Sequence, residues 1–305
     1  MQTNRLDIIV DVRPVVQRLR DVNRSGEATS RGFSENPDSG HRPAGGSSIL
    51  AGGRAGRWEE ALVDADKADD AGPGAVPVWV IVLAVIAAAS YGTFLLEHLL
   101  SPELDGVNGY VSELSASDQP YHLVYSGGDL VTGVLTIIVS LGSLRRLRRW
   151  PLATTGWAFL GLFGVCAIGD ATFPLDCAPS LETWCALRER SENVSFSHEF
   201  HSVTSSAVII CGVIALFTLS MAARRYDWWP ALARWGWLLA LAEAAFALST
   251  LLAMYLGQWL GIIQRVQITI LSLGLLTIAW ALYADRRAAG RAARPAPSAR
   301  EKTPL

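Results

Sequence analysis

Residues 200–222 read FHSVTSSAVIICGVIALFTLSMA and contain no Asp, Glu, Lys or Arg. A transmembrane helix needs about 20 consecutive, predominantly apolar residues, because the hydrocarbon core of a bilayer is about 30 Å thick. This stretch meets that requirement and predicts a helix that crosses a membrane. Five further stretches of similar character lie between residues 76 and 284, and together they set the fold class.

The composition agrees with a membrane protein. The chain has 305 residues, of which 50% are hydrophobic and 18% are charged, and its formal net charge is −2. An ordinary soluble domain has about 25% charged residues, so the composition and the long apolar runs exclude a single soluble globular domain. The chain lacks a concentrated basic face, which argues against nucleic acid as a partner. It also lacks a P-loop or dinucleotide fingerprint, which argues against a nucleotide.

We predict an all-α membrane protein with a six-helix transmembrane bundle over residues 77–284. The lipid bilayer is then its first partner. The spans are predicted at Val78–Leu96, His122–Leu144, Leu152–Ile168, Phe200–Ala222, Ala231–Tyr255 and Leu260–Tyr283.

The charges of the connecting loops predict the orientation. Arginines gather after the second and fourth spans, whereas acidic residues dominate the loops after the first and third; the arginines are Arg145, Arg146, Arg148, Arg149, Arg224, Arg225 and Arg234. Loops rich in Lys and Arg stay in the cytoplasm. The pattern therefore predicts a multi-pass protein of the plasma membrane with both termini in the cytoplasm.

The two ends of the chain read as tails. Residues 1–76 and 285–305 are rich in polar residues, Gly, Ala, Arg and Pro, and such segments bury too little apolar surface to offset chain entropy. We expect both to be disordered and cytoplasmic. Methionine occurs only at positions 1, 221 and 254. This scarcity leaves open a mis-assigned start, with part of residues 1–75 outside the mature protein.

Cys177 and Cys185 lie in the predicted second outer loop, within CAPSLETWC. Outside the cytoplasm such a pair can form a disulfide that closes a loop. Its spacing does not match a CxxC metal-binding pattern. We therefore predict a disulfide between Cys177 and Cys185.

Ionisable residues gather near the predicted outer ends of the spans. They are His98, His122, His198, His201, Glu97, Asp129, Asp170, Asp176, Glu199 and Arg265. Charged groups within a membrane are costly and usually face a cavity or a partner. Their concentration at one depth predicts either a functional centre or a structural polar network.

A divalent metal such as zinc is one interpretation of this cluster. His198 and His201 lie one turn apart on one helical face. Together with Asp170 and Asp176 they could hold the ion and leave a position open for water. In the alternative interpretation, both histidines are hydrogen-bonded to loop backbone.

Three other residues also allow two interpretations each. Asp129 is either a catalytic or metal-binding carboxylate, or the partner of Arg265 across the bundle. Ser112 is either a nucleophile activated by a histidine or a loop residue. Glu243, near the middle of the fifth span, either binds a proton in function or is protonated and hydrogen-bonded to a neighbouring helix.

Several short motifs resemble one family. Gly109–Ser115 (GYVSELS), leading into Asp129–Gly133 (DLVTG), is similar to the first outer loop and second helix of the "domain of unknown function 998" family. Phe173–Asp176 (FPLD), His201 with Ser202, and Gly261–Arg265 (GIIQR) resemble further motifs of that family in the same order.

The resemblance implies six helices and a polar centre on the outer side, without a settled reaction. It emphasises Ser112, Glu113, Asp176, His201 and Arg265, which stand at the motif positions. With Asp129, these are the candidate catalytic residues.

Two functions follow from these candidates. In the first, the protein acts on membrane lipids by metal-assisted hydrolysis. Asp176 and His201 would then be ligands or base, Arg265 would neutralise a lipid phosphate, and Ser112 or Glu113 would orient the water. In the second, the protein is a transporter component, lipid binder or assembly partner, and the cluster is structural.

Overall fold

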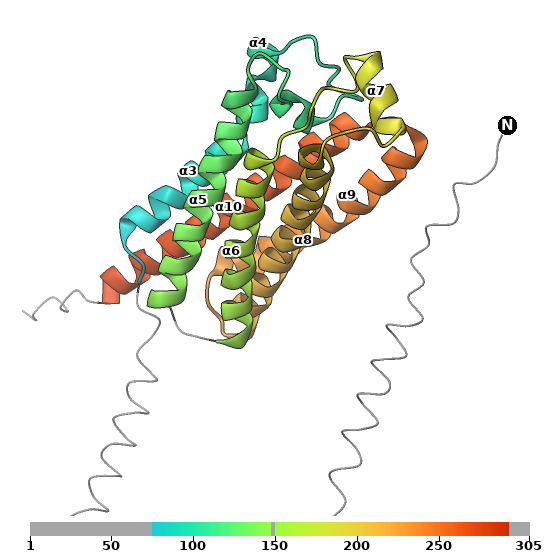
Figure 1. Ribbon diagram of the computed structural model, residues 1–305. Helices are drawn as coiled ribbons and strands as arrows, with labels where there is room; N and C mark the ends of the chain where they lie inside the picture. The colour runs from blue at the N-terminus through green and yellow to red at the C-terminus, as the bar shows by residue number, and fades with distance from the viewer. Residues whose placement is uncertain (1–74, 148–149, 293–305) are drawn as a thin grey trace, which may run out of the picture. The chain divides into compact units, whose positions relative to one another are not determined.

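A computed structural model describes residues 75–147 and 150–292, and the remaining parts of the predicted tails lie outside these residues. The described part contains helices and no strands (Figure 1). The helices are α3 (Val78–Tyr91), η1 (Thr93–Leu96), α4 (Glu97–Leu100), η2 (Val111–Ser115), α5 (His122–Arg146), α6 (Pro151–Thr172), α7 (Thr183–Arg190), α8 (Phe196–Arg225), η3 (Leu232–Gly236), α9 (Trp237–Leu256) and α10 (Leu260–Ala292).

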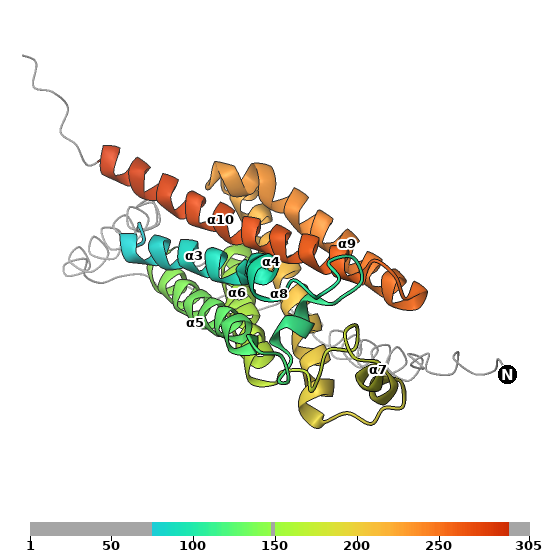
Figure 2. The same cartoon turned by 90° about the horizontal axis from the view of Figure 1, so that it is seen from above.

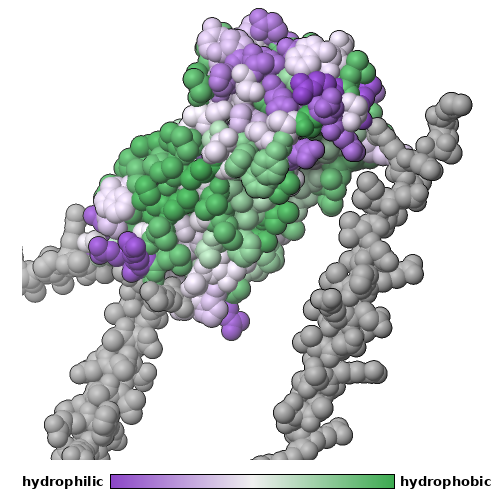
Figure 3. Space-filling view, viewed as in Figure 1, coloured by the Kyte–Doolittle hydropathy of each residue, from purple (hydrophilic) through white to green (hydrophobic). Residues whose placement is uncertain are grey.

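Five of these helices are long and apolar enough to cross a membrane, and a bent helix pair raises the number to six. The surface agrees with this, because apolar residues cover the middle of the bundle whereas hydrophilic residues lie at its ends and cover most area at one of them (Figure 3). We call that end the loop end. It carries α4, α7, a first loop (residues 101–121) and a second loop (residues 173–195).

The first predicted span, Val78–Leu96, is not one continuous helix. It breaks at Gly92, and the segment Thr93–Leu100 turns by 46° from α3. Glycine has a low helix propensity, and the backbone continues as a tighter 3-10 turn in which the Leu95 amide donates to the Gly92 carbonyl. The bend turns Glu97, at the start of α4, into the protein, where it is buried.

Four helices, α5, α6, α8 and α10, extend beyond the apolar runs that predicted them, whereas the fifth predicted span, Ala231–Tyr255, consists of η3 followed by α9. At the start of α8 the Ser195 hydroxyl accepts a hydrogen bond from the His198 amide, so this helix begins before Phe200. A side chain in this position satisfies an amide that the first turn leaves free. α10 continues past Tyr283 to Ala292, in a sequence rich in Ala and Arg, which favour helix.

Close approach of α5 and α6 organises the bundle, in which α6 packs between α5 and α8 (Figures 1 and 2). A Cβ atom added to Gly164 would lie 2.5 Å from the Gly133 carbonyl oxygen, and one added to Gly133 would lie 2.6 Å from the Gly164 carbonyl oxygen. Small residues allow such contact between membrane helices, where packing rather than the hydrophobic effect drives association.

We expect Gly164→Ala to lower the free energy of unfolding by about 1–3 kcal/mol, because the methyl group forces the two backbones apart. Thermal unfolding of the detergent-purified protein, followed by circular dichroism, measures this loss. Gly127→Ala is the control, because a Cβ atom at Gly127 would meet nothing within 4 Å. Equal stability of the two variants would contradict the close-packing argument.

Candidate functional site

Residues at and just before the start of α10 form hydrogen bonds with the first loop and hold it over the loop end. The Val111 amide donates to the side-chain oxygen of Gln264 over 2.8 Å, and the Trp259 amide donates to the side-chain oxygen of Asn108 over 3.0 Å. Arg265 donates to the Gly109 carbonyl over 3.0 Å. These contacts join residues far apart in the sequence and fix η2 above the bundle.

Arg265 forms a salt bridge with Glu97. Its Nε lies 2.8 Å from one carboxylate oxygen and its Nη2 lies 2.5 Å from the other. Both side chains are largely buried. The interpretation that Arg265 pairs with Asp129 is therefore wrong, because the bend at Gly92 brings Glu97 to the guanidinium instead. The role of Arg265 in the structure is to join α4, the first loop and α10.

Glu113 connects the first loop to the second. One carboxylate oxygen accepts from the Tyr110 amide, and the other accepts from the amide and the hydroxyl of Ser180. Burial raises the pKa of Glu113, and these hydrogen bonds offset part of the increase. The side chain is satisfied on both oxygens, as a structural carboxylate should be.

Asp176 and His198 organise the second loop. Asp176 accepts hydrogen bonds from the amide and the hydroxyl of Ser195, which precedes α8. Partial burial acts to raise the pKa of Asp176, but these bonds and the nearby His198 lower it overall. The Asp176 amide in turn donates to Nδ1 of His198 over 3.2 Å. Together these bonds anchor the second loop to the start of α8.

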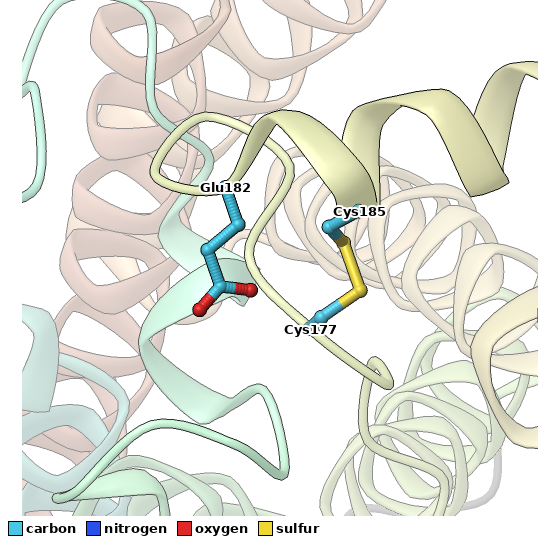
Figure 4. A group of neighbouring side chains, drawn as sticks. All are labelled: Cys177, Glu182 and Cys185. Carbon is cyan, nitrogen blue, oxygen red and sulfur yellow. A yellow bond between two sulfur atoms is a disulfide. The ribbon is translucent and has the colours of Figure 1, made fainter.

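Cys177 and Cys185 form a disulfide that ties the second loop to α7. Among the described residues, the carboxylate of Glu182 and these two sulfurs make the only close group of three possible metal donors (Figure 4). A metal binds cysteine as the thiolate, and here the sulfurs are bonded to each other. This group is therefore a loop closure and not a metal site.

A cavity of about 90 Å³ lies beneath η2. Side chains from α3, η1, η2, α5, α6, α8 and α10 surround it. The polar residues that line it are Tyr91, Thr93, Ser112, Ser115, Tyr125, Asp129, Asp170, His201, Ser205, Gln264 and Gln267, and the apolar ones are Phe94, Val111, Val208, Ile209, Ile268 and Leu271. No Lys or Arg of the described residues lines it, so the cavity is acidic.

His201 lines this cavity and has one ring nitrogen without a hydrogen-bond partner among the described residues. Its Nδ1 lies 2.9 Å from the Phe173 carbonyl, which can only accept, so Nδ1 carries the proton of the neutral ring. Nε2 is then an acceptor. It is buried and makes no hydrogen bond within the described part of the chain. Nδ1 also lies 3.9 Å from a carboxylate oxygen of Asp170.

The two carboxylates of the cavity have different surroundings. Asp170 accepts hydrogen bonds from the hydroxyls of Thr204 and Ser205. Asp129, on α5, lines the cavity and makes no side-chain hydrogen bond with the described residues. The cavity therefore offers one oriented carboxylate, one free carboxylate and one imidazole acceptor.

The structure thus separates the predicted residues into two groups. Ser112, Asp129, Asp170 and His201 meet at the cavity. Glu113, Asp176, His198 and Arg265 hold the loops and line no part of it. The predicted metal set divides accordingly, with His201 beside Asp170 and His198 beside Asp176.

Sequence reasoning missed Gln264 and Gln267 as cavity residues. Both were visible as polar positions in the first turns of an otherwise apolar span. Gln267 also reaches deeper, since its amide donates to Glu243 over 3.5 Å and accepts from Thr250 over 2.8 Å. The second carboxylate oxygen of Glu243 is buried and has no hydrogen-bond partner among the described residues.

Comparison with known proteins gives one match. The family model described as "Protein of unknown function (DUF998)" matches residues 81–281. The match covers the helices that surround the cavity. No curated protein and no solved structure matches the chain.

We expect Arg265→Ala to lower the free energy of unfolding by about 3–5 kcal/mol, because it leaves the buried Glu97 carboxylate without its partner. Thermal unfolding measures the loss. The double variant Glu97→Gln/Arg265→Gln should recover part of it, since no buried charge remains. Arg190→Ala, at an exposed position of the same end, is the control. An equal loss in the control would remove the special role of the pair.

The raised pKa of Glu113 predicts a pH dependence. A carboxyl group that binds its proton more tightly in the folded state than in the unfolded state stabilises the fold at low pH. This stabilisation is lost as the pH rises above 4.5, the ordinary pKa of glutamate, and through the raised pKa of Glu113 in the fold. The melting temperature of the wild type should therefore fall over this range more steeply than that of Glu113→Gln. Glu103→Gln, at an exposed position of the same loop, should show the same fall of melting temperature with pH as the wild type. The same fall in Glu113→Gln would show that the Glu113 carboxyl is not the group responsible.

Proposed function

Since the chain belongs to the DUF998 family, whose description assigns no activity, we propose its function from the geometry of the cavity. The protein is a six-span protein of the plasma membrane that receives the polar part of a membrane lipid in the cavity. It hydrolyses that lipid with His201 as general base.

The proposed orientation rests on charge. The loops and helix ends opposite the loop end carry the arginines, and such segments remain in the cytoplasm. With the bent pair as one span, both termini lie on that side. The cavity then faces the outer leaflet, and the disulfide of the second loop lies in an oxidising compartment.

The observation that carries the proposal is the free Nε2 of His201. The structural part of the polar cluster is internally satisfied: Glu97 with Arg265, Glu113 with Ser180, and Asp176 with Ser195. A buried polar atom without a protein partner is rare and calls for an explanation. Because His201 is one of the residues that line the cavity, we infer that a molecule entering the cavity supplies the partner of Nε2.

The apolar lining supports a lipid as that molecule. Phe94, Ile268 and Leu271 border the same cavity as the carboxylates, so polar and hydrocarbon parts of one ligand find matching surfaces. Binding sites of this kind combine apolar walls with a few placed polar groups.

The reaction follows from the position of the base. His201 Nε2 accepts a proton from a water molecule while the water oxygen bonds to the carbonyl carbon of a lipid ester or amide. The bond to the leaving group then breaks, and the leaving group takes the proton from Nε2. Asp170 and the Phe173 carbonyl stabilise the charged imidazole between these steps. Asp129 and Ser112 are positioned to bind the polar groups of the lipid.

Asp129, Asp170 and His201 provide two carboxylates and an imidazole nitrogen, donor types that suit a divalent metal such as zinc, but among the described residues their donor atoms do not form a close group of three. When bound, such an ion lowers the pKa of its water. The metal content of the purified protein is therefore measured in the same experiment as activity.

The test incubates the protein in nanodiscs of mixed membrane lipids and detects new products by mass spectrometry. We expect His201→Ala to reduce product formation by about 10²–10⁴-fold, the usual contribution of a general base. Asp129→Asn should weaken lipid binding. His98→Ala is the matched control, because the His98 side chain is 81% exposed and does not line the cavity.

Two results would reject this function. If the wild type forms no product from any lipid but still binds one, the protein is a non-catalytic lipid binder or transporter component. If His201→Ala is as active as His98→Ala, the cavity is not the catalytic site.

A further inference from the structure

A second feature lies at the other end of α10, away from the cavity. A groove of about 640 Å³ runs between α3, η3 and α10. Its lining includes Ile81 and Val85 of α3, Trp235 of η3, and Leu276 and Trp280 of α10. α3 and α10 lie side by side along it (Figure 2).

The groove is apolar along its length. The Thr277 hydroxyl, which lies in its wall, donates its proton to the Leu273 carbonyl of its own helix, so that proton is not free for a ligand. Trp235 and Trp280 are 51% and 61% exposed. Rings of this kind are most stable at the boundary between hydrocarbon and headgroups. The groove therefore starts at an interface and extends into the apolar zone.

Two arginines lie over aromatic rings that line this groove. The guanidinium carbon of Arg234 lies 5.1 Å from the ring centroid of Trp235, and that of Arg287 lies 4.9 Å from the ring centroid of Tyr283. Both rings line the groove. Neither arginine forms an ion pair with a carboxylate of residues 75–147 or 150–292. Their positive charge is therefore available to a ligand.

We propose that this groove is a binding site for one anionic phospholipid, with the phosphate at Arg234 and Arg287 and an acyl chain along Ile81, Val85 and Leu276. Arginine binds phosphate oxygens through several donors at once. The aromatic rings hold each guanidinium at the groove while leaving its donors free. This site is independent of the function proposed for the cavity.

A second copy of the chain is a less suitable occupant. A symmetric contact through this face would bring the arginines of both copies to one interface. Like charges brought together there would repel each other. The charge of the groove end therefore favours an anionic ligand over self-association.

The test is native mass spectrometry of the detergent-purified full chain with added phosphatidylglycerol or phosphatidylcholine of identical acyl chains. The wild type should retain one phosphatidylglycerol in clear preference to phosphatidylcholine. Each interfacial arginine contributes about a fivefold gain in affinity for an anionic surface. Arg234→Gln/Arg287→Gln should therefore weaken phosphatidylglycerol binding about tenfold or more, and bring it close to phosphatidylcholine binding.

Two further variants keep this result interpretable. Arg145→Gln/Arg146→Gln removes the same charge from the end of α5, outside the groove lining, and should retain the lipid. Val85→Trp should obstruct the acyl chain and reduce the binding of both lipids without changing charge. Circular dichroism verifies that each variant is folded.

Three outcomes would overturn the proposal. The first is equal retention of the two lipids by the wild type. The second is an equal loss of phosphatidylglycerol in the Arg145/Arg146 control. The third is a dimer that carries no lipid and that Arg234→Gln/Arg287→Gln strengthens. Inorganic phosphate alone should not displace the lipid, and displacement would show that the groove binds only the headgroup.

Discussion

A buried charge in a membrane bundle must be paired, and the Glu97–Arg265 pair meets this constraint at the point where most of the loop end is joined. Removing two ions from water costs several kcal/mol each unless geometry and further hydrogen bonds compensate. Here Arg265 contacts both oxygens of Glu97 and also the Gly109 carbonyl. The bent α3–α4 segment, the first loop and α10 are thereby held together, and η2 is fixed above the cavity.

Because the Glu97–Arg265 pair joins the loop end, the other ionisable residues there fall into two groups. Side chains with complete hydrogen bonds, such as Glu113 and Asp176, connect the two loops and the start of α8. Because they keep the loops in place, the groups below them can stay partly unsatisfied. His201 and Asp129 are two of these partly unsatisfied groups. A buried polar group without a protein partner is tolerated where a ligand can form the missing hydrogen bond. The structural interpretation of the cluster therefore holds for Glu97, Glu113, Asp176 and Arg265, whereas a functional role for His201 and Asp129 is what we propose.

The two ends of α10 present opposite charge. The cavity near Gln264 is lined by carboxylates and by no described cation, whereas the groove near Tyr283 ends at two arginines. The absence of Arg265 from the cavity lining also changes the expected substrate. Arg265 does not line the cavity, so under the proposed function the substrate is expected to present groups that donate hydrogen bonds or carry positive charge, and not a phosphate held by Arg265. If both proposals hold, each end of the helix selects a different chemical class of lipid group.

The sequence by itself determined the all-helical membrane architecture, the approximate position of nearly every span and the family, because hydropathy and short motifs are local properties. It also indicated that Ser112, Asp129, Asp170 and His201 lie near one end of the bundle. It did not determine the break at Gly92, the partner of Arg265, or the separation of His201 from His198. These depend on contacts such as that between residues 97 and 265. Periodicity along one helix carries no information about which distant side chain will complete a buried charge, so only the tertiary structure decides it.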